Sequence, residues 1–155
     1  MVSRTLSFKS AAALQDWGRR LARRLKADDT LALVGPLGAG KTMLAQSLAA
    51  AWGYRRGANS PTFALANEYR TPRGVVYHMD MYRLSERELA AFPLEEYWGG
   101  GLCLVEWADR VRDRWPKDTL EIHLDIRGAE ERAVRFVRPT PAWQKRLRTG
   151  SPPLL

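Results

Sequence analysis

The octapeptide GPLGAGKT, from Gly35 to Thr42, matches the pattern G-x-x-x-x-G-K-[ST], in which a glycine-rich turn joins a strand to a helix. Residues 30–34 (TLALV) before it predict a short buried strand, and residues 43–52 (MLAQSLAAAW) after it predict a helix. The glycines let backbone N–H groups approach a polyphosphate closely, and the helix start adds unpaired N–H groups at the positive end of its dipole. The stretch therefore predicts a nucleotide-binding loop.

Two side chains of this loop have specific expected roles. The Lys41 ammonium group would reach the β- and γ-phosphates, and the Thr42 hydroxyl would be a ligand of Mg²⁺. The predicted nucleotide-binding residues of the loop and helix start are Gly38, Ala39, Gly40, Lys41, Thr42 and Met43. A glycine-rich turn with a surface lysine is the alternative, which the flanking strand and helix disfavour. Because the chain has no N-K-x-D run of the kind that reads guanine, ATP is preferred over GTP.

Length and composition are those of one globular domain. The chain has 155 residues, of which 45% are hydrophobic and 27% charged, and we expect a single domain over residues 1–148. Residues 149–155 are expected to form a disordered C-terminal tail. No apolar run approaches the roughly 20 residues that span a bilayer, and the N-terminus lacks a signal-peptide pattern. The one cysteine, Cys103, allows no intrachain disulfide, which favours a cytoplasmic location without membrane contact.

The net charge of +8 is concentrated near the two ends of the chain. Residues 1–26 contain seven basic residues and one acidic residue, and three more basic residues follow Pro139 without any acid. Such an excess would suit an acidic partner such as RNA, although a solvated helix face is the preferred explanation. Because no RNA-binding module or interleaved aromatic residues accompany the charges, we expect any contact with RNA to be indirect or weak.

The remaining pattern predicts an open α/β sheet. Further strands are expected at residues 5–9, 64–70, 75–80, 102–105, 120–126 and 133–137, and further helices at 11–26, 85–92, 109–115 and 141–147. The strands at 75–80 and 102–105 are apolar and lead into polar residues, as in a parallel sheet, whereas 120–126 and 133–137 predict an antiparallel hairpin. The expected fold is the three-layer fold of P-loop nucleoside triphosphatases, with a parallel central sheet and added antiparallel strands.

Acidic residues follow two of these strands. Glu106 comes after four apolar residues, as it would at the end of a Walker-B strand, and Asp80 ends the strand at 75–80. Each carboxylate alone would serve equally well as a turn or helix cap, but beside a P-loop the pair fits a Mg²⁺–nucleotide site. We expect Glu106 to contact the metal, directly or through water, and Asp80 to position water or act as a base.

Other candidate site residues are individually weaker. Thr62 lies in a proline-constrained loop and would sense the γ-phosphate as switch loops do, or it is a plain loop threonine. Trp107 is interpreted as a core residue and His78 as a hydrogen-bonded structural histidine, because one histidine makes no metal site. The candidates for stabilising phosphate charge are Arg70, Arg83 and Arg132.

Four runs in this order resemble one family. G-P-L-G-A-G-K-T, S-P-T-F, H-M-D-M-Y-R-L and L-C-L-V-E-W resemble the TsaE family, the bacterial ATPase of tRNA threonylcarbamoyladenosine biosynthesis, over about residues 5–138. The P-loop is common to many families, whereas the H-x-D-x-Y-R-L run and the V-E-W run are far more specific.

The resemblance implies a small cytoplasmic ATPase whose Mg²⁺ is held by Thr42 and Glu106. Asp80 would be needed for hydrolysis, with Lys41 and Glu106 also in the catalytic set, Thr62 in a switch-like loop and Arg132 near the nucleotide. The implied partners are the protein subunits of the synthase that attaches threonylcarbamoyl to adenosine 37 of tRNA, and hydrolysis would support turnover of that complex. A small-molecule kinase of the P-loop fold is the alternative, which would need an acceptor pocket and an arginine-rich lid.

Overall fold

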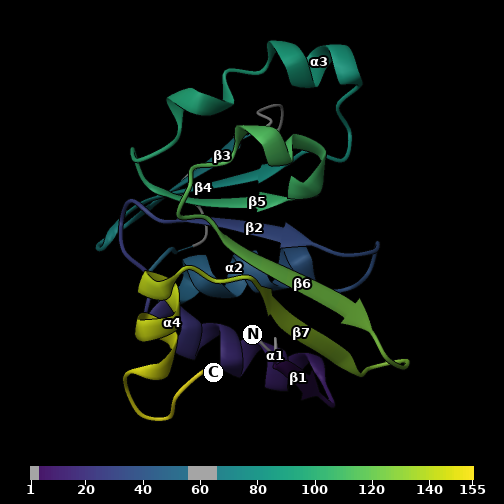
Figure 1. Cartoon of the computed structure of the whole chain (residues 1–155), viewed down its shortest axis with the longest axis vertical. Coiled ribbons are helices and arrows are strands. Elements are labelled where there is room, and N and C mark those ends of the chain that lie inside the picture. The colour runs from purple at the N-terminus through teal and green to yellow at the C-terminus, as the bar shows by residue number, and fades with distance from the viewer. Residues whose placement is uncertain (1–3, 56–65) are drawn as a thin grey trace.

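The computed structural model describes residues 4–55 and 66–155, which form one seven-stranded sheet with helices on both of its faces (Figure 1). The elements in chain order are β1 (Thr5–Phe8), α1 (Ala11–Ala22), β2 (Thr30–Val34), α2 (Lys41–Ala51), β3 (Ala66–Thr71), β4 (Gly74–Asp80), α3 (Glu86–Ala91), η1 (Leu94–Glu96), β5 (Leu102–Glu106), η2 (Ala108–Arg114), β6 (Leu120–Ile126), β7 (Arg132–Val137) and α4 (Pro141–Arg148). Within these described ranges, no helix has the length and apolar composition needed to cross a bilayer.

The sheet has the order β1-β7-β6-β2-β5-β4-β3. Its centre is parallel, because β2 pairs in parallel with β5 and β6, and β4 pairs in parallel with β5. The outer pairs β1–β7, β6–β7 and β3–β4 are antiparallel. A mixed α/β fold with a parallel centre and antiparallel additions is therefore confirmed.

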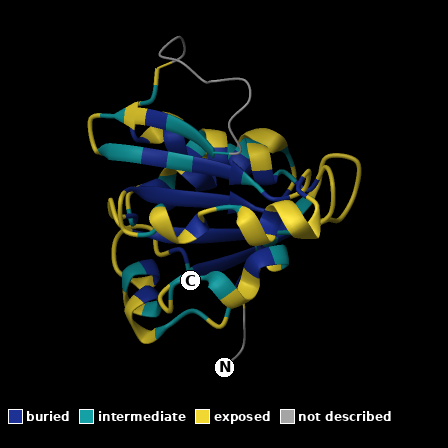
Figure 2. Cartoon of the chain, turned by 90° about the horizontal axis from the view of Figure 1, so that it is seen from above, coloured by how far each residue is buried: buried dark blue, intermediate teal, exposed yellow. Residues whose placement is uncertain are grey.

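β2 and β5, at the centre of the sheet, are almost wholly apolar because both of their faces are covered (Figure 2). In β5, Leu102 and Leu104 belong to the cluster formed with α1, α2 and α4. Cys103 and Val105 point to the other face and pack in a second cluster with residues of α3, η1 and η2. This strand thus shows the continuous apolar run expected of a strand buried on both sides.

Two predicted helices are shorter or less regular in the structure. The helix expected at 11–26 begins after the Ser10 cap and ends at Ala22, whose carbonyl accepts hydrogen bonds from the side chains of Arg73 and Trp52. Residues 108–114 form two 3₁₀ turns separated by a kink at Val111 instead of the α-helix expected at 109–115. The first difference goes with tertiary hydrogen bonds at the end of α1, and the second with the backbone kink at Val111. The local sequence pattern contains neither feature.

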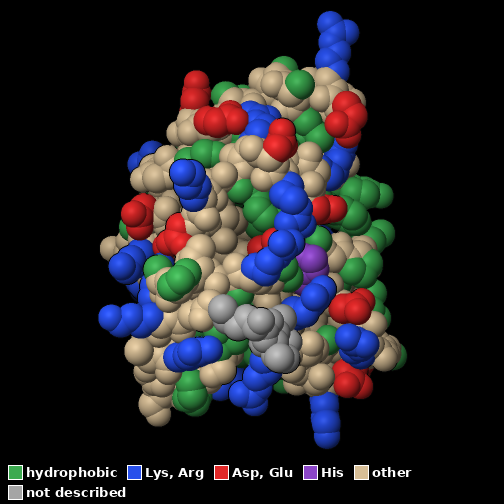
Figure 3. All heavy atoms as spheres, in the orientation of Figure 1, with side chains coloured by type: hydrophobic (Ala, Val, Ile, Leu, Met, Phe, Trp, Pro, Cys, Tyr) green, Lys and Arg blue, Asp and Glu red, His purple; other side chains and the backbone are tan. Residues whose placement is uncertain are grey.

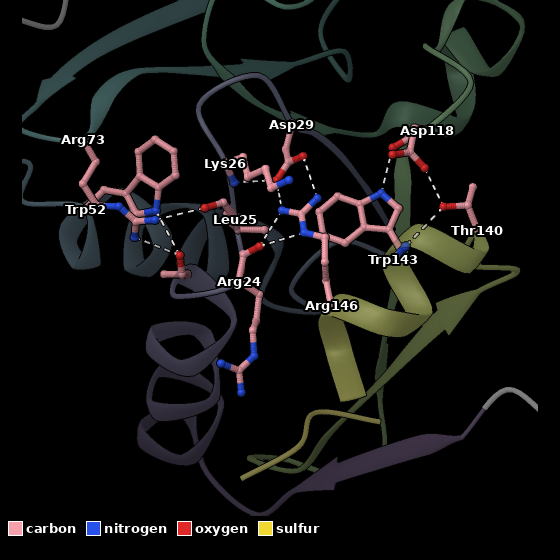
Figure 4. A network of polar contacts seen from close by, with 11 residues as sticks. Arg24, Leu25, Lys26, Asp29, Trp52, Arg73, Asp118, Thr140, Trp143 and Arg146 are labelled. Atoms are coloured by element: carbon pink, nitrogen blue, oxygen red, sulfur yellow. Dashed lines mark hydrogen bonds and ion pairs between the residues drawn. The ribbon is translucent and has the colours of Figure 1, made fainter. Parts of the chain in front are cut away.

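The C-terminal helix α4 is attached to the turn between α1 and β2 (Figure 4). The Arg146 guanidinium group donates to both carboxylate oxygens of Asp29, at 3.0 Å for Nη1 and Oδ1, and to the backbone carbonyl of Arg24. It also lies 3.9 Å from the centre of the Trp143 ring, whose indole N–H donates to the carbonyl of Asp118 at 2.8 Å. Contacts between residues more than a hundred positions apart therefore hold this helix in place.

The segment 149–155, for which the sequence predicts disorder, is mostly exposed but contacts the rest of the protein at Leu154 and Pro152. Leu154 is buried, and its N–H donates to the carbonyl of Leu147 at 2.8 Å. The carbonyl of Pro152 accepts a hydrogen bond from Arg24 at 3.2 Å. The apolar surface that receives Leu154 is assembled from distant segments, so the sequence of the tail gives no signal of this contact.

We expect Arg146→Ala to lower the free energy of unfolding by about 2 kcal/mol, because it leaves the buried Asp29 carboxylate without its cationic partner. Urea denaturation followed by circular dichroism measures this change. Arg148→Ala removes the same charge from an exposed position of the same helix and should change the free energy by less than about 0.5 kcal/mol. Equal losses in the two variants would contradict the role assigned to Arg146.

Candidate nucleotide and metal site

Four of the predicted site residues lie together at the carboxyl edge of the parallel strands: Lys41, Thr42, Asp80 and Glu106. β2 ends at Val34 and leads directly into the glycine-rich loop, which is followed by α2. In the sheet register, Glu106 at the end of β5 lies between Leu33 of β2 and Asp80 of β4. Since ligands of open α/β sheets collect at this edge, the geometry agrees with the site expected from the sequence.

Glycine is required at two positions of the loop. A Cβ atom on Gly35 would lie 2.2 Å from the carbonyl oxygen of Leu124 in β6, a distance that the packed backbone cannot accept. Gly40, the residue before α2, has φ of 103°, and its Cβ would lie 3.2 Å from a methyl group of Leu14. The loop therefore fits tightly between β6 and α1, with the N-terminus of α2 at its end.

The Lys41 ammonium group is enclosed by the loop that it follows. Its Nζ atom donates to the carbonyls of Gly35 at 2.6 Å and Pro36 at 2.8 Å, and it lies 4.3 Å from the centre of the Trp107 ring. Burial lowers the pKa of Lys41, while the nearby carboxylates of Glu106, Asp80 and Asp109 oppose that shift. These carboxylates favour the charged form of a lysine that faces the site.

Glu106 connects the loop helix to the neighbouring strand. The Thr42 hydroxyl donates to Glu106 Oε1 at 2.6 Å, and Nε2 of His78 lies 2.5 Å from Glu106 Oε2. The other ring nitrogen of His78 is 3.1 Å from the hydroxyl of Tyr69 in β3. Both oxygens of this buried carboxylate thus have partners, and one partner is the hydroxyl expected to bind Mg²⁺.

Asp80 begins a loop that is tied to the segment after Glu106. Its Oδ1 atom accepts a hydrogen bond from the N–H of Tyr82 at 2.9 Å, which is the turn-capping contact weighed for it above. Arg110 of η2 donates to the carbonyls of Met81 and Leu84, each at 2.6 Å. The two acidic strand ends are therefore held in a fixed relation by both the sheet register and this arginine.

Trp107 packs against the second hydrophobic cluster, as the sequence predicts, and it also faces the candidate site. It adopts a left-handed backbone conformation with φ of 55° and remains half-buried, between Lys41 and the ring of Tyr82 at 4.6 Å. A non-glycine residue in this conformation directly after a strand-end acid is unusual, and such positions concentrate at functional sites. No pattern in the sequence distinguishes this tryptophan from a core tryptophan.

The remaining candidates are placed as follows. Arg132 donates to the carbonyl of Gly128 at 3.1 Å and lines a pocket of ≈ 410 Å³ together with Gly38, Gly40 and Met43. Arg70 instead pairs with Glu68 of its own strand, at 3.3 Å. Thr62 lies outside the described residues. Arg132 therefore lies beside the glycine-rich loop, where a bound phosphate could reach it, whereas Arg70 pairs with a carboxylate of its own strand.

The oxygen donors at this edge suit a magnesium ion. Within residues 4–55 and 66–155, no group of three His, Cys, Asp or Glu side chains has the arrangement of a protein-only metal site. Mg²⁺ usually binds through one or two carboxylates together with substrate phosphates and water, so it needs no such group. The 2.6 Å contact between Thr42 and Glu106 brings a hydroxyl and a carboxylate together next to the loop, and these residues fit the ion.

Fold and site together define an α/β protein that carries a P-loop sequence with two strand-end carboxylates beside it. The family model described as "Threonylcarbamoyl adenosine biosynthesis protein TsaE" matches residues 8–134. The chain belongs to the TsaE family, and the resemblance stated above is confirmed. Helix α4 and the C-terminal segment lie beyond the matched residues.

Individual relatives agree with this assignment. Over 112 residues the chain is 42% identical to the tRNA threonylcarbamoyladenosine biosynthesis protein TsaE of Bacillus subtilis, covering 72% of this chain and 70% of that protein. It is 40% identical to the protein of the same name from Synechocystis over 104 residues, covering 64% of this chain and 66% of that protein. The crystal structure of Bacillus subtilis YdiB matches with a TM-score of 0.76 and 28% identity, covering 96% of this chain and 95% of that chain.

Proposed function

We propose that this chain is a Mg²⁺-dependent ATPase of the P-loop nucleoside triphosphatase fold. The observation that carries the proposal is the contact between Thr42 and Glu106, which lies beside Lys41 at the carboxyl edge of the sheet. A hydroxyl, a carboxylate and an ammonium group at a glycine-rich loop are the side chains that hold a metal–triphosphate. ATP is the proposed nucleotide, since the sequence has no run for reading guanine.

Each residue would have a separate task in hydrolysis. Backbone N–H groups of the loop and the start of α2 would bind the phosphates, and Lys41 would neutralise charge on the β- and γ-phosphates. Bound Mg²⁺, held by Thr42 and Glu106, would supply further charge neutralisation. Asp80 would orient the attacking water or accept its proton, and Arg132 would lie near the nucleotide on the other side of the loop.

The role proposed for this activity is to support tRNA modification. Membership of the TsaE family favours binding to the protein subunits of the threonylcarbamoyladenosine synthase complex and support of its turnover at adenosine 37 of tRNA, in the cytoplasm. Contact with tRNA itself is proposed to be indirect or weak. On the face drawn in Figure 3, Lys and Arg side chains are scattered among acidic ones instead of forming one basic surface.

ATP turnover by the full chain tests the proposal when measured alone, with the purified synthase proteins, and with tRNA added. We expect slow turnover alone and strong stimulation by the synthase proteins. Asp80→Asn should retain ATP binding and lose about 10²–10⁴-fold in turnover, because it removes the proposed base. An unchanged rate in that variant would contradict the role of Asp80, and a phosphorylated metabolite as product would favour a kinase instead.

A further inference from the structure

Four side chains form a hydrogen-bonded row that crosses the sheet toward the glycine-rich loop, and three of them are buried while Thr42, at the loop end, is exposed. The row runs from Tyr69 in β3 through His78 in β4 and Glu106 in β5 to Thr42 in α2, with successive distances of 3.1, 2.5 and 2.6 Å. Tyr69, His78 and Glu106 are 8%, 7% and 3% exposed. The buried part of this row, from Tyr69 to Glu106, is expected to hold each of its side chains in one orientation.

The donor and the acceptor of each hydrogen bond in this row can be assigned without conflict. Thr42 donates to one oxygen of Glu106, so the other oxygen needs a donor, and Nε2–H of His78 is placed to supply it. Nδ1 is then free to accept a hydrogen bond from the Tyr69 hydroxyl. Burial raises the pKa of Tyr69, which keeps this phenol protonated and able to donate.

A purely structural histidine would not need this connection. The ring centroids of His78 and Tyr69 are 5.9 Å apart, and this contact would be sufficient if the two side chains only filled space in the core. The row, however, ends on the carboxylate and hydroxyl that fit Mg²⁺, and residues that orient metal ligands act through such hydrogen bonds. Without a partner on its second oxygen, Glu106 would carry an unsatisfied buried acceptor and would be free to turn away from Thr42.

We propose that His78 and Tyr69 are positioning residues that hold Glu106 in the orientation needed for Mg²⁺ binding. The inference rests on the proposed function, since it concerns the metal of the same site. His78 acts directly on the carboxylate, and Tyr69 acts through His78 by keeping the proton on Nε2. Neither residue touches the nucleotide.

Two variants of His78 with similar side chains separate positioning from packing. The amide of Gln reaches the place of Nε2 and keeps a donor for Glu106, whereas the shorter Asn reaches only the place of Nδ1, beside Tyr69. ATP affinity is measured by titration with Mg²⁺ and again with EDTA, using the full chain. We expect the Mg²⁺-dependent gain in affinity to fall about 10-fold in His78→Asn and to recover in His78→Gln, with the metal-free affinity unchanged.

His123→Asn is the matched control. His123 also pairs with a buried glutamate, with 2.6 Å between its Nε2 and Glu121 Oε1, so its loss breaks the same kind of contact away from Glu106. Tyr69→Phe removes a single oxygen atom and retains the ring, and it should reduce the Mg²⁺-dependent gain by a smaller factor. This variant keeps the test valid if substitution of His78 prevents folding.

Nitrogen-15 NMR of the wild-type protein shows which ring nitrogen of His78 carries the proton, and it needs no substitution among the four residues of the row. The chain has two histidines, so His123→Asn assigns the His78 signals. We expect a protected imidazole proton on Nε2 of His78, and a proton found only on Nδ1 would overturn the inference. Equal Mg²⁺-dependent gains in His78→Asn and the wild-type protein would also overturn it, whereas absence of ATP binding by the wild-type protein would refute the proposed function itself.

Discussion

Lys41→Ala is expected to lower ATP turnover by about 10²–10³-fold, the cost of removing one charged group that stabilises the transition state. Its Nζ atom sits within hydrogen-bond distance of two loop carbonyls and against the Trp107 ring, so the charge is already aimed at the loop. Turnover and ATP affinity are both measured, because a lysine that contacts phosphates in the ground state also contributes to binding.

Lys145→Ala is the control for the change in net charge. It removes one positive charge from an exposed position of α4, and turnover should stay at the wild-type level. Circular dichroism checks that Lys41→Ala remains folded, since the loop carbonyls of Gly35 and Pro36 lose a donor in that variant. Wild-type activity of a folded Lys41→Ala protein would mean that the loop does not hold a triphosphate as proposed.

Glu106→Gln should abolish most Mg²⁺-dependent hydrolysis, with a loss of about 100-fold or more. Loss of a carboxylate that holds the metal removes several kcal/mol of charge stabilisation, at about 1.4 kcal/mol for each tenfold in rate. The amide keeps the size of the side chain but replaces one acceptor oxygen with a donor, so it removes the negative charge and one of the two oxygen positions now held by Thr42 and His78. Turnover measured across a Mg²⁺ titration separates weaker metal binding, which excess Mg²⁺ restores, from a lower rate at saturation.

Glu121→Gln provides the comparison for a buried glutamate outside the site. Glu121 accepts hydrogen bonds from Arg112 and from His123, and despite burial these contacts lower its pKa. The variant should lose stability, because the paired charge is removed, yet keep its Mg²⁺ dependence. A normal Mg²⁺ dependence in Glu106→Gln would refute the assignment of Glu106 as a metal ligand.

Much of the sheet could be predicted because its signals are local. Each strand expected from the pattern is present within a few residues, and the hairpin of β6 and β7 follows the alternation of its two runs. The segment at 108–114 differed from the predicted helix because the backbone kinks at Val111, and the sequence did not predict that Leu154 packs on a surface formed by distant segments. The local periodicity of the sequence contains no information about the kink or about the surface that receives Leu154.

In the candidate site too, some residues could be predicted from the sequence, whereas their contacts could not. Spacing and strand ends predicted the loop, Glu106 and Asp80 as site residues, and the sheet register places the two acids side by side. His78 was interpreted as a hydrogen-bonded structural histidine, which the structure confirms, and its partner proves to be Glu106. A histidine two positions before a strand-end aspartate gives no sign of which neighbouring strand it will contact.

By itself, the sequence determined the glycine-rich turn between a strand and a helix and the family to which the chain belongs. A glycine-rich turn between a strand and a helix is a local arrangement, so short-range residue order is sufficient to specify it. Only the tertiary structure decided that Tyr69, His78, Glu106 and Thr42 form one row, and that Trp107 faces Lys41. These contacts depend on which strands pair and in what register, which the packing of the whole chain sets.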